Sequence, residues 1–323
     1  MGNSAPGTAA AFKAALVNEG LNVIEYRDWS NNFRPPSVGA WGNLYGSMMH
    51  HTAGDFNGIL DYLYDGDQSL PGPLCHAAIM KNGDVYLIGW GRANHAGGGD
   101  PTVATEVMNE SYGANPTPPQ FHQGEPGAAD GNTRFVGFEC VNLGDCVDPW
   151  PAVQVTAMKK AATAVARLYG WSAKSAIAHF EWSDQKIDPA CLPGAGPGFS
   201  GFRASVQTLL NAPAPGPIDP NPPIIPATSV SCANIIESAK TDPKAPQGAT
   251  THPQEVLAVE NALVQLGYLD PLYADGSFGT KTVTAYACFQ QYLGYVAAGA
   301  DGIPGCTSLK YLGLRTGLFT TTP

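Results

Sequence analysis

The chain has 323 residues, which is long enough for about two domains with separate cores. Its net charge is −10 and its pI is near 5.0, so its electrostatic field repels nucleic acid and anionic lipid. No apolar run approaches the roughly 18 residues of a membrane span. We therefore expect no nucleic-acid partner and no stable membrane association. The residues 1–8 lack the basic and apolar regions of a secretory signal, so we expect no export by that route.

The first part of the chain alternates between helical and strand patterns. Phe12, Ala15 and Leu16 have helical spacing, and Gly20 suits a left-handed helix end. The segment 44–51 is a short apolar run that ends in two histidines, as in a buried strand that reaches the rim of a sheet. We predict helices at 8–19, 56–64, 151–170 and 202–210, and strands at 21–26, 44–51, 75–80, 85–90, 134–141 and 176–178. This order predicts an α/β domain, a mixed sheet with flanking helices.

Two of these segments carry further detail. The Asn82-Gly83 pair between two apolar runs predicts a tight β-hairpin turn. In the strand at 134–141, Glu139 and Gly137 alternate with apolar residues, so they face the side of the sheet opposite to Phe138. The segment 96–132 is mostly Gly, Pro, Asn and Thr, and we predict a long surface loop there.

The C-terminal part has a different pattern. The segment 212–226 is dense in proline and predicts a semi-rigid linker between a domain at 1–211 and a second at 227–323, whose core is 252–314. Asp275-Gly276 and Asp301-Gly302 begin two similar motifs, each flanked by apolar helical stripes. We therefore predict a small all-α bundle of three helices.

The seven cysteines form no C-x-x-C pair, and we expect most of them to be buried thiols. An alternative is one disulfide that joins Cys232 to Cys288 or Cys306.

Two histidines and one aspartate suggest a metal site. His50 ends the strand at 44–51, and His179 follows the strand at 176–178, with Asp188 shortly after it. Two neutral imidazoles and a carboxylate are a common ligand set for catalytic Zn²⁺, and they leave a fourth position for water. Because single histidines are more often structural, the spacing alone does not decide the matter.

The motifs around these residues resemble a known family, the zinc-dependent N-acetylmuramoyl-L-alanine amidases of the amidase-2 and peptidoglycan-recognition type. The resemblance covers about residues 20 to 192 and rests on segments in family order, namely 50–54, 81–86, 94–97, 136–140, 179 and 186–189. It implies that His50, His179 and Asp188 hold Zn²⁺, with Cys191 as a rival to Asp188. His51 faces the opposite side and is expected to be structural.

The resemblance also assigns catalytic roles to two other residues. Glu139 would act as general base, although a structural ion pair is the alternative. Lys186 would stabilise the oxyanion of the tetrahedral intermediate, although it could be a plain exposed lysine.

Three further residues are candidates for substrate contact. His95 lies in a Gly-rich loop, Thr52 follows the histidine strand, and His76 follows Cys75. Cys75 stands where some family members carry a catalytic tyrosine, which puts a tyrosine-assisted mechanism in doubt. His76 could equally be a packed histidine, and we interpret His122 and His252 as surface residues.

The C-terminal motifs closely resemble the three-helix peptidoglycan-binding domain of many cell-wall hydrolases. The two resemblances together imply a phage endolysin that cuts the bond between N-acetylmuramic acid and L-alanine in bacterial peptidoglycan. Such an enzyme would be made in the host cytoplasm without a signal peptide and would act on the wall after release. The alternatives are a non-catalytic peptidoglycan receptor and a bacterial autolysin or recycling amidase.

Overall fold

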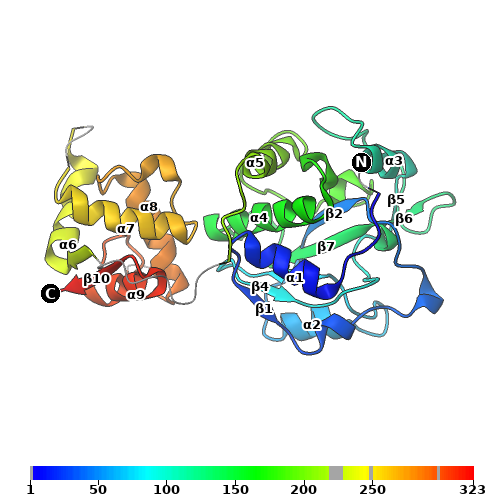
Figure 1. Cartoon of the computed structure of the whole chain (residues 1–323), viewed down its shortest axis with the longest axis horizontal. Helices are drawn as coiled ribbons and strands as arrows, with labels where there is room; N and C mark the ends of the chain where they lie inside the picture. Colours follow the sequence, from blue (N-terminus) through cyan, green and yellow to red (C-terminus); the bar gives the residue numbers. More distant parts are fainter. Residues whose placement is uncertain (1–2, 218–227, 247–249, 297–298) are drawn as a thin grey trace. The chain divides into compact units, whose positions relative to one another are not determined.

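The computed structural model describes residues 3–217, 228–246, 250–296 and 299–323 (Figure 1). The chain divides into two compact units, residues 1–218 and 219–323. Part of the predicted linker, residues 218–226, lies outside the described residues. Among the described residues, no helix combines the length and the apolar character needed to span a bilayer.

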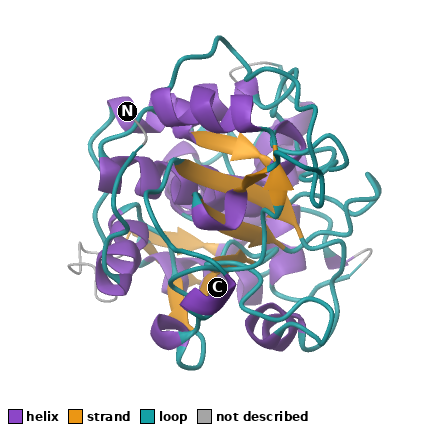
Figure 2. Ribbon diagram, turned by 90° about the vertical axis from the view of Figure 1, so that its right-hand side faces the viewer, coloured by secondary structure: helices purple, strands orange, loops and turns teal. Residues whose placement is uncertain are grey.

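A six-stranded sheet forms the centre of the first unit, with the strand order β1-β4-β3-β7-β2-β8 (Figure 2). Only β3 and β4 pair antiparallel in this sheet, through the predicted turn, where Gly83 has φ of 80°. The remaining pairs are parallel, and residues of the central strands are almost all buried, as expected of a sheet covered on both faces. The strands are β1 (Val23–Glu25), β2 (Gly46–His51), β3 (Ala77–Ile79), β4 (Val85–Leu87), β7 (Phe135–Cys140) and β8 (Ala176–Ala178).

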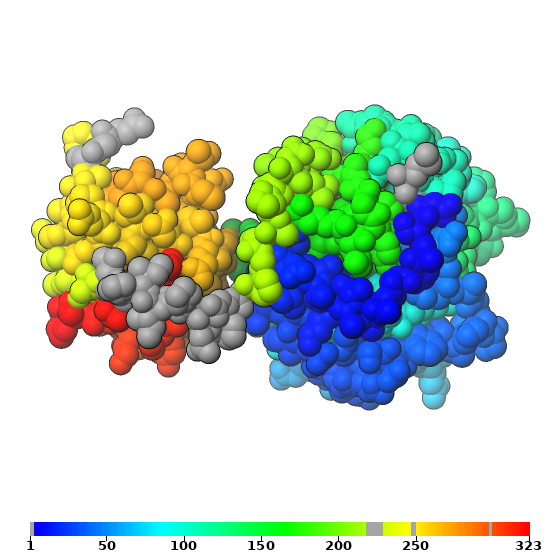
Figure 3. All heavy atoms as spheres, viewed as in Figure 1, coloured from blue at the N-terminus to red at the C-terminus, as the bar shows by residue number. Residues whose placement is uncertain are grey.

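Helices α1 (Ala9–Asn18), α4 (Ala152–Tyr169) and α5 (Ser200–Asn211) build the main hydrophobic core with one face of the sheet. Figure 3 shows α1 in blue beside α4 in green, and the two helices are in contact. Thr8 accepts a hydrogen bond from the Ala11 amide and caps α1, as its residue type favours. Phe138 is fully buried in this core, which stabilises the fold by about 1.5–3 kcal/mol.

The opposite face carries α2 (Ile59–Asp65), α3 (Pro101–Asn109) and the short pair β5 (Gly98–Gly99) and β6 (Ala129–Asp130). The prediction of an unstructured loop at 96–132 was wrong where α3 forms. The Asp100 side chain accepts a hydrogen bond from the Thr102 amide, Pro101 starts the helix, and α3 buries Val103 and Val107. Helix α2 starts at Ile59, later than predicted, because Gly58 has a left-handed φ of 90°.

The second unit contains α6 (Cys232–Thr241), α7 (Pro253–Gln265), α8 (Thr280–Tyr292) and α9 (Cys306–Thr316). The three predicted helices are present as α7, α8 and α9. Helix α6 covers 233–240, where the sequence suggests one or two helical turns. The structure also has a parallel pair of strands, β9 (Thr228–Ser231) and β10 (Phe319–Thr322), which the all-α prediction did not include.

The internal repeat of the second unit is visible as two equivalent hydrogen bonds. Glu260 Oε2 accepts the Gly276 amide at 2.7 Å, and Gln290 Oε1 accepts the Gly302 amide at 2.7 Å. Both glycines have positive φ, 83° and 78°, which a side chain would disfavour. A buried acceptor thus fixes each Asp-Gly turn.

The cysteines differ from the prediction. A disulfide joins Cys146 to Cys191, with 5.4 Å between their Cα atoms. The alternative that paired Cys232 with Cys288 or Cys306 was wrong, since all three are free thiols. Because Cys191 is bonded to Cys146, it cannot compete with Asp188 for a metal.

Candidate metal centre

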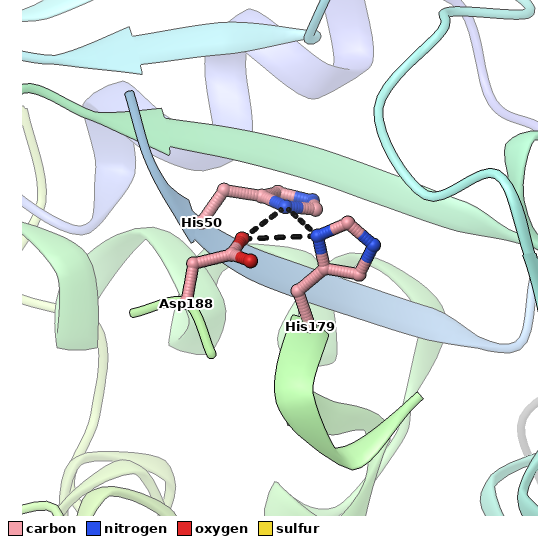
Figure 4. A group of neighbouring side chains, drawn as sticks. All are labelled: His50, His179 and Asp188. Atoms are coloured by element: carbon pink, nitrogen blue, oxygen red, sulfur yellow. Dashed lines mark hydrogen bonds and ion pairs between the residues drawn. The ribbon is translucent and has the colours of Figure 1, made fainter. Parts of the chain in front are cut away.

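The structure brings His50, His179 and Asp188 together in a buried cluster (Figure 4). His50 lies near the end of β2, His179 begins a 3₁₀ turn after β8, and Asp188 follows in a loop. The Nδ1 atoms of the two histidines are 2.9 Å apart, and Asp188 Oδ2 lies 3.0 Å from His50 Nδ1 and 2.9 Å from His179 Nδ1. One donor atom from β2 and two from the segment 179–188 therefore form one small triangle.

The hydrogen bonds on the far side of each ring decide which nitrogen is free. His95 Nε2 lies 3.0 Å from the Phe135 carbonyl oxygen, which can only accept, so His95 carries its proton there. His95 Nδ1 is then an acceptor, and it lies 3.0 Å from His50 Nε2, which must donate. In the neutral ring, His50 Nδ1 is left with a bare lone pair.

The Nδ1 atom of His179 is also left without a proton, through a single hydrogen bond on the far side of its ring. Its Nε2 lies 3.2 Å from the Ala96 carbonyl oxygen and therefore donates, which leaves His179 Nδ1 bare in the neutral ring. Burial and the neighbouring His179 lower the pKa of His50 to about 4, so His50 is neutral at pH 7. In the neutral form of both rings, two lone pairs and a carboxylate oxygen face one another.

This arrangement fits a divalent cation. Ligands of tetrahedral Zn²⁺ at about 2.0–2.1 Å are about 3.3 Å apart, and the observed separations of 2.9–3.0 Å are only slightly shorter. Two imidazoles and one carboxylate also match the donor set of catalytic zinc. The Ala96 carbonyl behind His179 is a usual outer partner of a metal-binding histidine, whereas the imidazole of His95 takes that place behind His50. We conclude that the triad can hold Zn²⁺ and leave a coordination position free.

The loop 95–97 positions both imidazoles, and Asn132 holds this loop. Asn132 Oδ1 accepts the amides of all three residues, at 2.9 Å, 2.8 Å and 3.1 Å. No sequence pattern indicates this role, because a single asparagine in a loop is commonplace.

A buried ion pair fixes the turn that carries His179. Arg203 of α5 binds Glu181 with two nitrogens, at 2.7 Å and 2.8 Å. Glu181 Oε2 also accepts the Ala178 amide at 3.2 Å. A bidentate ion pair fixes the orientation of its two partners. It therefore holds the turn in which His179 lies two residues before Glu181.

Glu139 stands beside His50 on the neighbouring strand. In the parallel register of β2 and β7, His50 pairs with Glu139, so the two side chains share one face of the sheet. Glu139 Oε2 is buried and has no hydrogen-bond partner among the described residues. Burial raises the pKa of Glu139 well above its usual range, the Asp188 charge adds to the rise, and Lys186 opposes it.

Lys186 lies in an exposed segment two residues before Asp188. Its charge acts on both Glu139 and His50. Among the described residues, no hydrogen bond or ion pair holds its ammonium group. It therefore remains available to a bound substrate.

The three residues predicted to contact substrate are all engaged within the protein. His76 is fully buried, accepts the Gly137 amide at 2.8 Å and donates to the Gly91 carbonyl at 2.8 Å. Both ring nitrogens of His95 are occupied, as described above. The Thr52 hydroxyl lies 2.6 Å from the Gly54 carbonyl and accepts the Asn142 amide at 3.1 Å. These contacts lie within the protein, and contact of the three residues with substrate stays a prediction. His51 is also structural, since its Nδ1 accepts the Ala190 amide at 3.1 Å.

Comparison with known proteins finds a family model that matches the segment containing this centre. Residues 42–191 match the profile of the Amidase_2 family, described as N-acetylmuramoyl-L-alanine amidase. This segment includes the triad, Glu139 and Lys186. No curated protein matches the chain.

Two solved structures are similar to the chain at low identity. The crystal structure of AmpDh3 from Pseudomonas aeruginosa is 17% identical, with a TM-score of 0.35, and covers 89% of this chain and 97% of that chain. The second is the complex of the N-acetylmuramyl-L-alanine amidase AmiD from E. coli with the substrate anhydro-N-acetylmuramic acid-L-Ala-D-gamma-Glu-L-Lys. It is 16% identical, with a TM-score of 0.29, and covers 91% of this chain and 98% of that chain.

Proposed function

We propose that the chain is a zinc-dependent N-acetylmuramoyl-L-alanine amidase, and the match of residues 42–191 to the Amidase_2 family model supports this proposal. It would hydrolyse the amide between the lactyl group of N-acetylmuramic acid and the L-alanine of the stem peptide in bacterial peptidoglycan. The observation that carries this proposal is the triad of His50, His179 and Asp188, with two bare imidazole nitrogens, beside the buried carboxyl group of Glu139.

His50, His179 and Asp188 would hold the metal. When bound there, Zn²⁺ would supply a Lewis acid for the scissile carbonyl group and for a water molecule, whose pKa such a metal lowers to about 7. Asp188 contributes one negative charge, so the site keeps a net positive charge. The relay through His95 and the Ala96 carbonyl keeps both imidazoles in the orientation that presents Nδ1.

Glu139 would move the proton. It accepts a proton from the attacking water and later delivers it to the nitrogen of the departing L-alanine, which leaves as an amine. Its raised pKa favours the second of these transfers, and a nearby dication lowers that pKa so that the first can also occur. The unpartnered Oε2 atom is free for both transfers.

Lys186 would stabilise the negative charge that develops on the carbonyl oxygen during attack. A single donor of this kind is worth roughly 3 kcal/mol of transition-state stabilisation. Its exposed position places it where a substrate can reach it.

We also propose that the second unit holds the enzyme on the wall and that the protein is a phage endolysin, made in the host cytoplasm and released to the wall. In this unit, a pocket of about 460 Å³ is lined by Tyr292, Tyr295 and Tyr311. Tyrosine presents an apolar ring with a polar tip, which suits contact with a hydrated polymer. Attachment to the wall raises the effective concentration of the first unit near its substrate.

The wall-binding proposal has a direct test. We expect Tyr311→Ala in the full chain to reduce retention on purified sacculi, because the ring is 57% exposed and lines the pocket. Tyr273→Ala is the matched control, since Tyr273 is 41% exposed in the same unit and does not line that pocket. Equal retention of both variants and the unchanged chain would contradict this site.

The amidase proposal is tested by digestion of purified peptidoglycan. We expect new L-alanine amino termini without new reducing sugars, and loss of this release when a chelator removes the metal. New reducing ends would instead indicate a glycosidase. Binding of peptidoglycan without any release would indicate the non-catalytic receptor.

A further inference from the structure

The disulfide joins the two segments that carry the chemistry of the site. Cys146 lies in the loop that follows β7, the strand of Glu139. Cys191 lies three residues after Asp188. The bond closes a stretch of 45 residues. It links the segment 184–191, the arm that carries Asp188, to the loop that follows the strand of Glu139.

The loop on the Cys146 side is well fixed. The Asp145 carboxylate accepts the amides of Val147 and Asp148, at 2.9 Å and 2.8 Å. The Asp148 carboxylate accepts the Leu143 amide at 2.8 Å and pairs with Lys81 at 2.7 Å. This loop therefore provides a rigid point of attachment.

The arm that carries Asp188 is exposed before the ligand, where the Asp184 amide bonds to the Phe121 carbonyl and the Lys186 amide to the Ser183 carbonyl, each at 3.2 Å. Residues 184–187 are exposed, and the Ile187 side chain is 69% exposed. The Asp188 carbonyl accepts the Phe180 amide at 3.0 Å. Beyond it, the Ala190 carbonyl accepts Trp150 Nε1 at 2.9 Å, and the Ala190 amide bonds to His51. Cys191 then provides the covalent attachment.

The backbone at both ends of the bond is also unusual. Cys146 has φ of 65° and Cys191 has φ of 52°, a region that residues other than glycine rarely adopt. Each conformation costs free energy that the surroundings must offset. The two unfavourable conformations occur together at the two half-cystines, which indicates that the bond helps to hold them.

We propose that the Cys146–Cys191 disulfide is a positioning element of the metal centre, which fixes Asp188 against His50 and His179. Metal affinity therefore depends on the oxidation state of the two cysteines. The oxidised protein coordinates the ion with three ligands, and the reduced protein coordinates it mainly with the two imidazoles. This inference rests on the proposed function only for its catalytic consequence, because metal binding can be measured by itself.

The reduction can be carried out with a trialkylphosphine. The phosphine gives two electrons to the S–S bond and becomes a phosphine oxide, and one water molecule supplies its oxygen and the protons of the two thiols. The free thiols then no longer restrain the loop that carries Asp188.

The test compares Zn²⁺ affinity of the full chain in its oxidised form, after phosphine reduction, and as the Cys146→Ser/Cys191→Ser variant. Chelator competition measures the affinity, and we expect a loss of 10- to 100-fold in both altered forms, as for the loss of other groups that support metal ligands. Cys288→Ser is the control, because it removes a free cysteine of the other unit and is expected to retain the affinity of the unchanged chain.

A second readout separates positioning from plain stabilisation. The visible spectrum of the Co²⁺-loaded protein reports on the ligand set, and we expect it to change when the disulfide is broken while the protein remains folded. An unchanged spectrum and unchanged Zn²⁺ affinity, with only a lower melting temperature, would overturn the inference. If the variant fails to fold, reduction of the folded unchanged chain gives the same comparison. A failure of the amidase assay would not affect these measurements.

Discussion

The ring of His95 lies directly against Gly137: a β carbon at Gly137 would stand 2.5 Å from His95 Cγ. Gly137 is the residue of β7 that precedes Glu139 on the same face of the sheet. The absence of a side chain there lets His95 reach His50 and fix its tautomer. A glycine within a strand thus serves the metal centre.

We expect Gly137→Ala to weaken Zn²⁺ binding by at least 10-fold, because the added methyl group displaces His95. Gly113→Ala is the matched control, since a β carbon at Gly113 would meet no atom within 4 Å. The measurement is chelator competition on both purified variants. Equal affinities would contradict the role given to Gly137.

Substitution of His95 itself tests the relay. His95→Ala removes the acceptor for His50 Nε2, and we expect a 10- to 100-fold loss of Zn²⁺ affinity. His95→Gln keeps a carbonyl oxygen and an N–H group, so we expect it to retain more affinity than His95→Ala. The relay would be disproved if the alanine variant bound Zn²⁺ as tightly as the unchanged chain.

Glu139→Gln separates catalysis from metal binding. The variant keeps the shape of the side chain but cannot accept a proton, and we expect kcat to fall by about 10²- to 10⁴-fold. Zn²⁺ content, measured by atomic absorption, is expected to stay at one per chain because Glu139 is not a ligand. Full activity in this variant would remove Glu139 from the mechanism.

The buried histidines predict a pH dependence of stability for the metal-free protein. Burial lowers the pKa of His76 from 6.5 to about 4, so between these values the unfolded chain binds more protons than the folded chain. The free energy of unfolding therefore falls as pH falls, by about 2 kcal/mol at pH 5 from His76 alone. Denaturant titration of the metal-free chain and of His76→Asn from pH 7.5 to pH 5 measures this effect as the difference between the two profiles, because Glu139, whose pKa is raised, acts in the opposite direction in both. Equal profiles would contradict the prediction.

In the second unit, the repeat predicts a stabilising substitution. Burial raises the pKa of Glu260 from 4.5 to about 7, so its contribution to stability is lost as pH rises through this range. Gln290 holds the equivalent turn without a charge. We expect Glu260→Gln to raise stability at pH 8 by at most about 3 kcal/mol and to have much less effect at pH 5.

Gln290→Glu is the reverse substitution in the other repeat. It would place a carboxylate against the Ile303 carbonyl, which now accepts Gln290 Nε2 at 2.8 Å, and we expect lower stability. Thermal unfolding of the full chain at both pH values measures the two variants. A loss of stability in Glu260→Gln at pH 8 would show that the carboxylate is needed.

Features with a local cause were predictable from the sequence. The strand that ends at His50 is an uninterrupted apolar run, and the alternation around Glu139 gave the correct face of β7. Asn82-Gly83 gave the hairpin because this pair suits one type of turn. Family motifs then supplied the ligand set that the structure brings together.

Features that depend on distant contacts were not predictable. The partners of His95 are 45 and 40 residues away along the chain, so its loop motif alone suggested substrate contact. The Cys146–Cys191 pair has no sequence signature, since only the fold brings the two loops together. Helix α3 did have a local signal, Asp100-Pro101 before a short apolar stripe, which the surrounding glycine and proline residues obscured.

The pairing of His50 with Glu139 across β2 and β7 has a consequence for protein engineering. Strand spacing in a sheet is about 4.8 Å and varies little, so the distance between this ligand and the proton carrier is set by the backbone. Under the proposed amidase function, loops at the rim can then be exchanged to accept other cell walls while this distance stays the same. The arm that carries Asp188 is the exception, and a graft there has to bring its own cysteine.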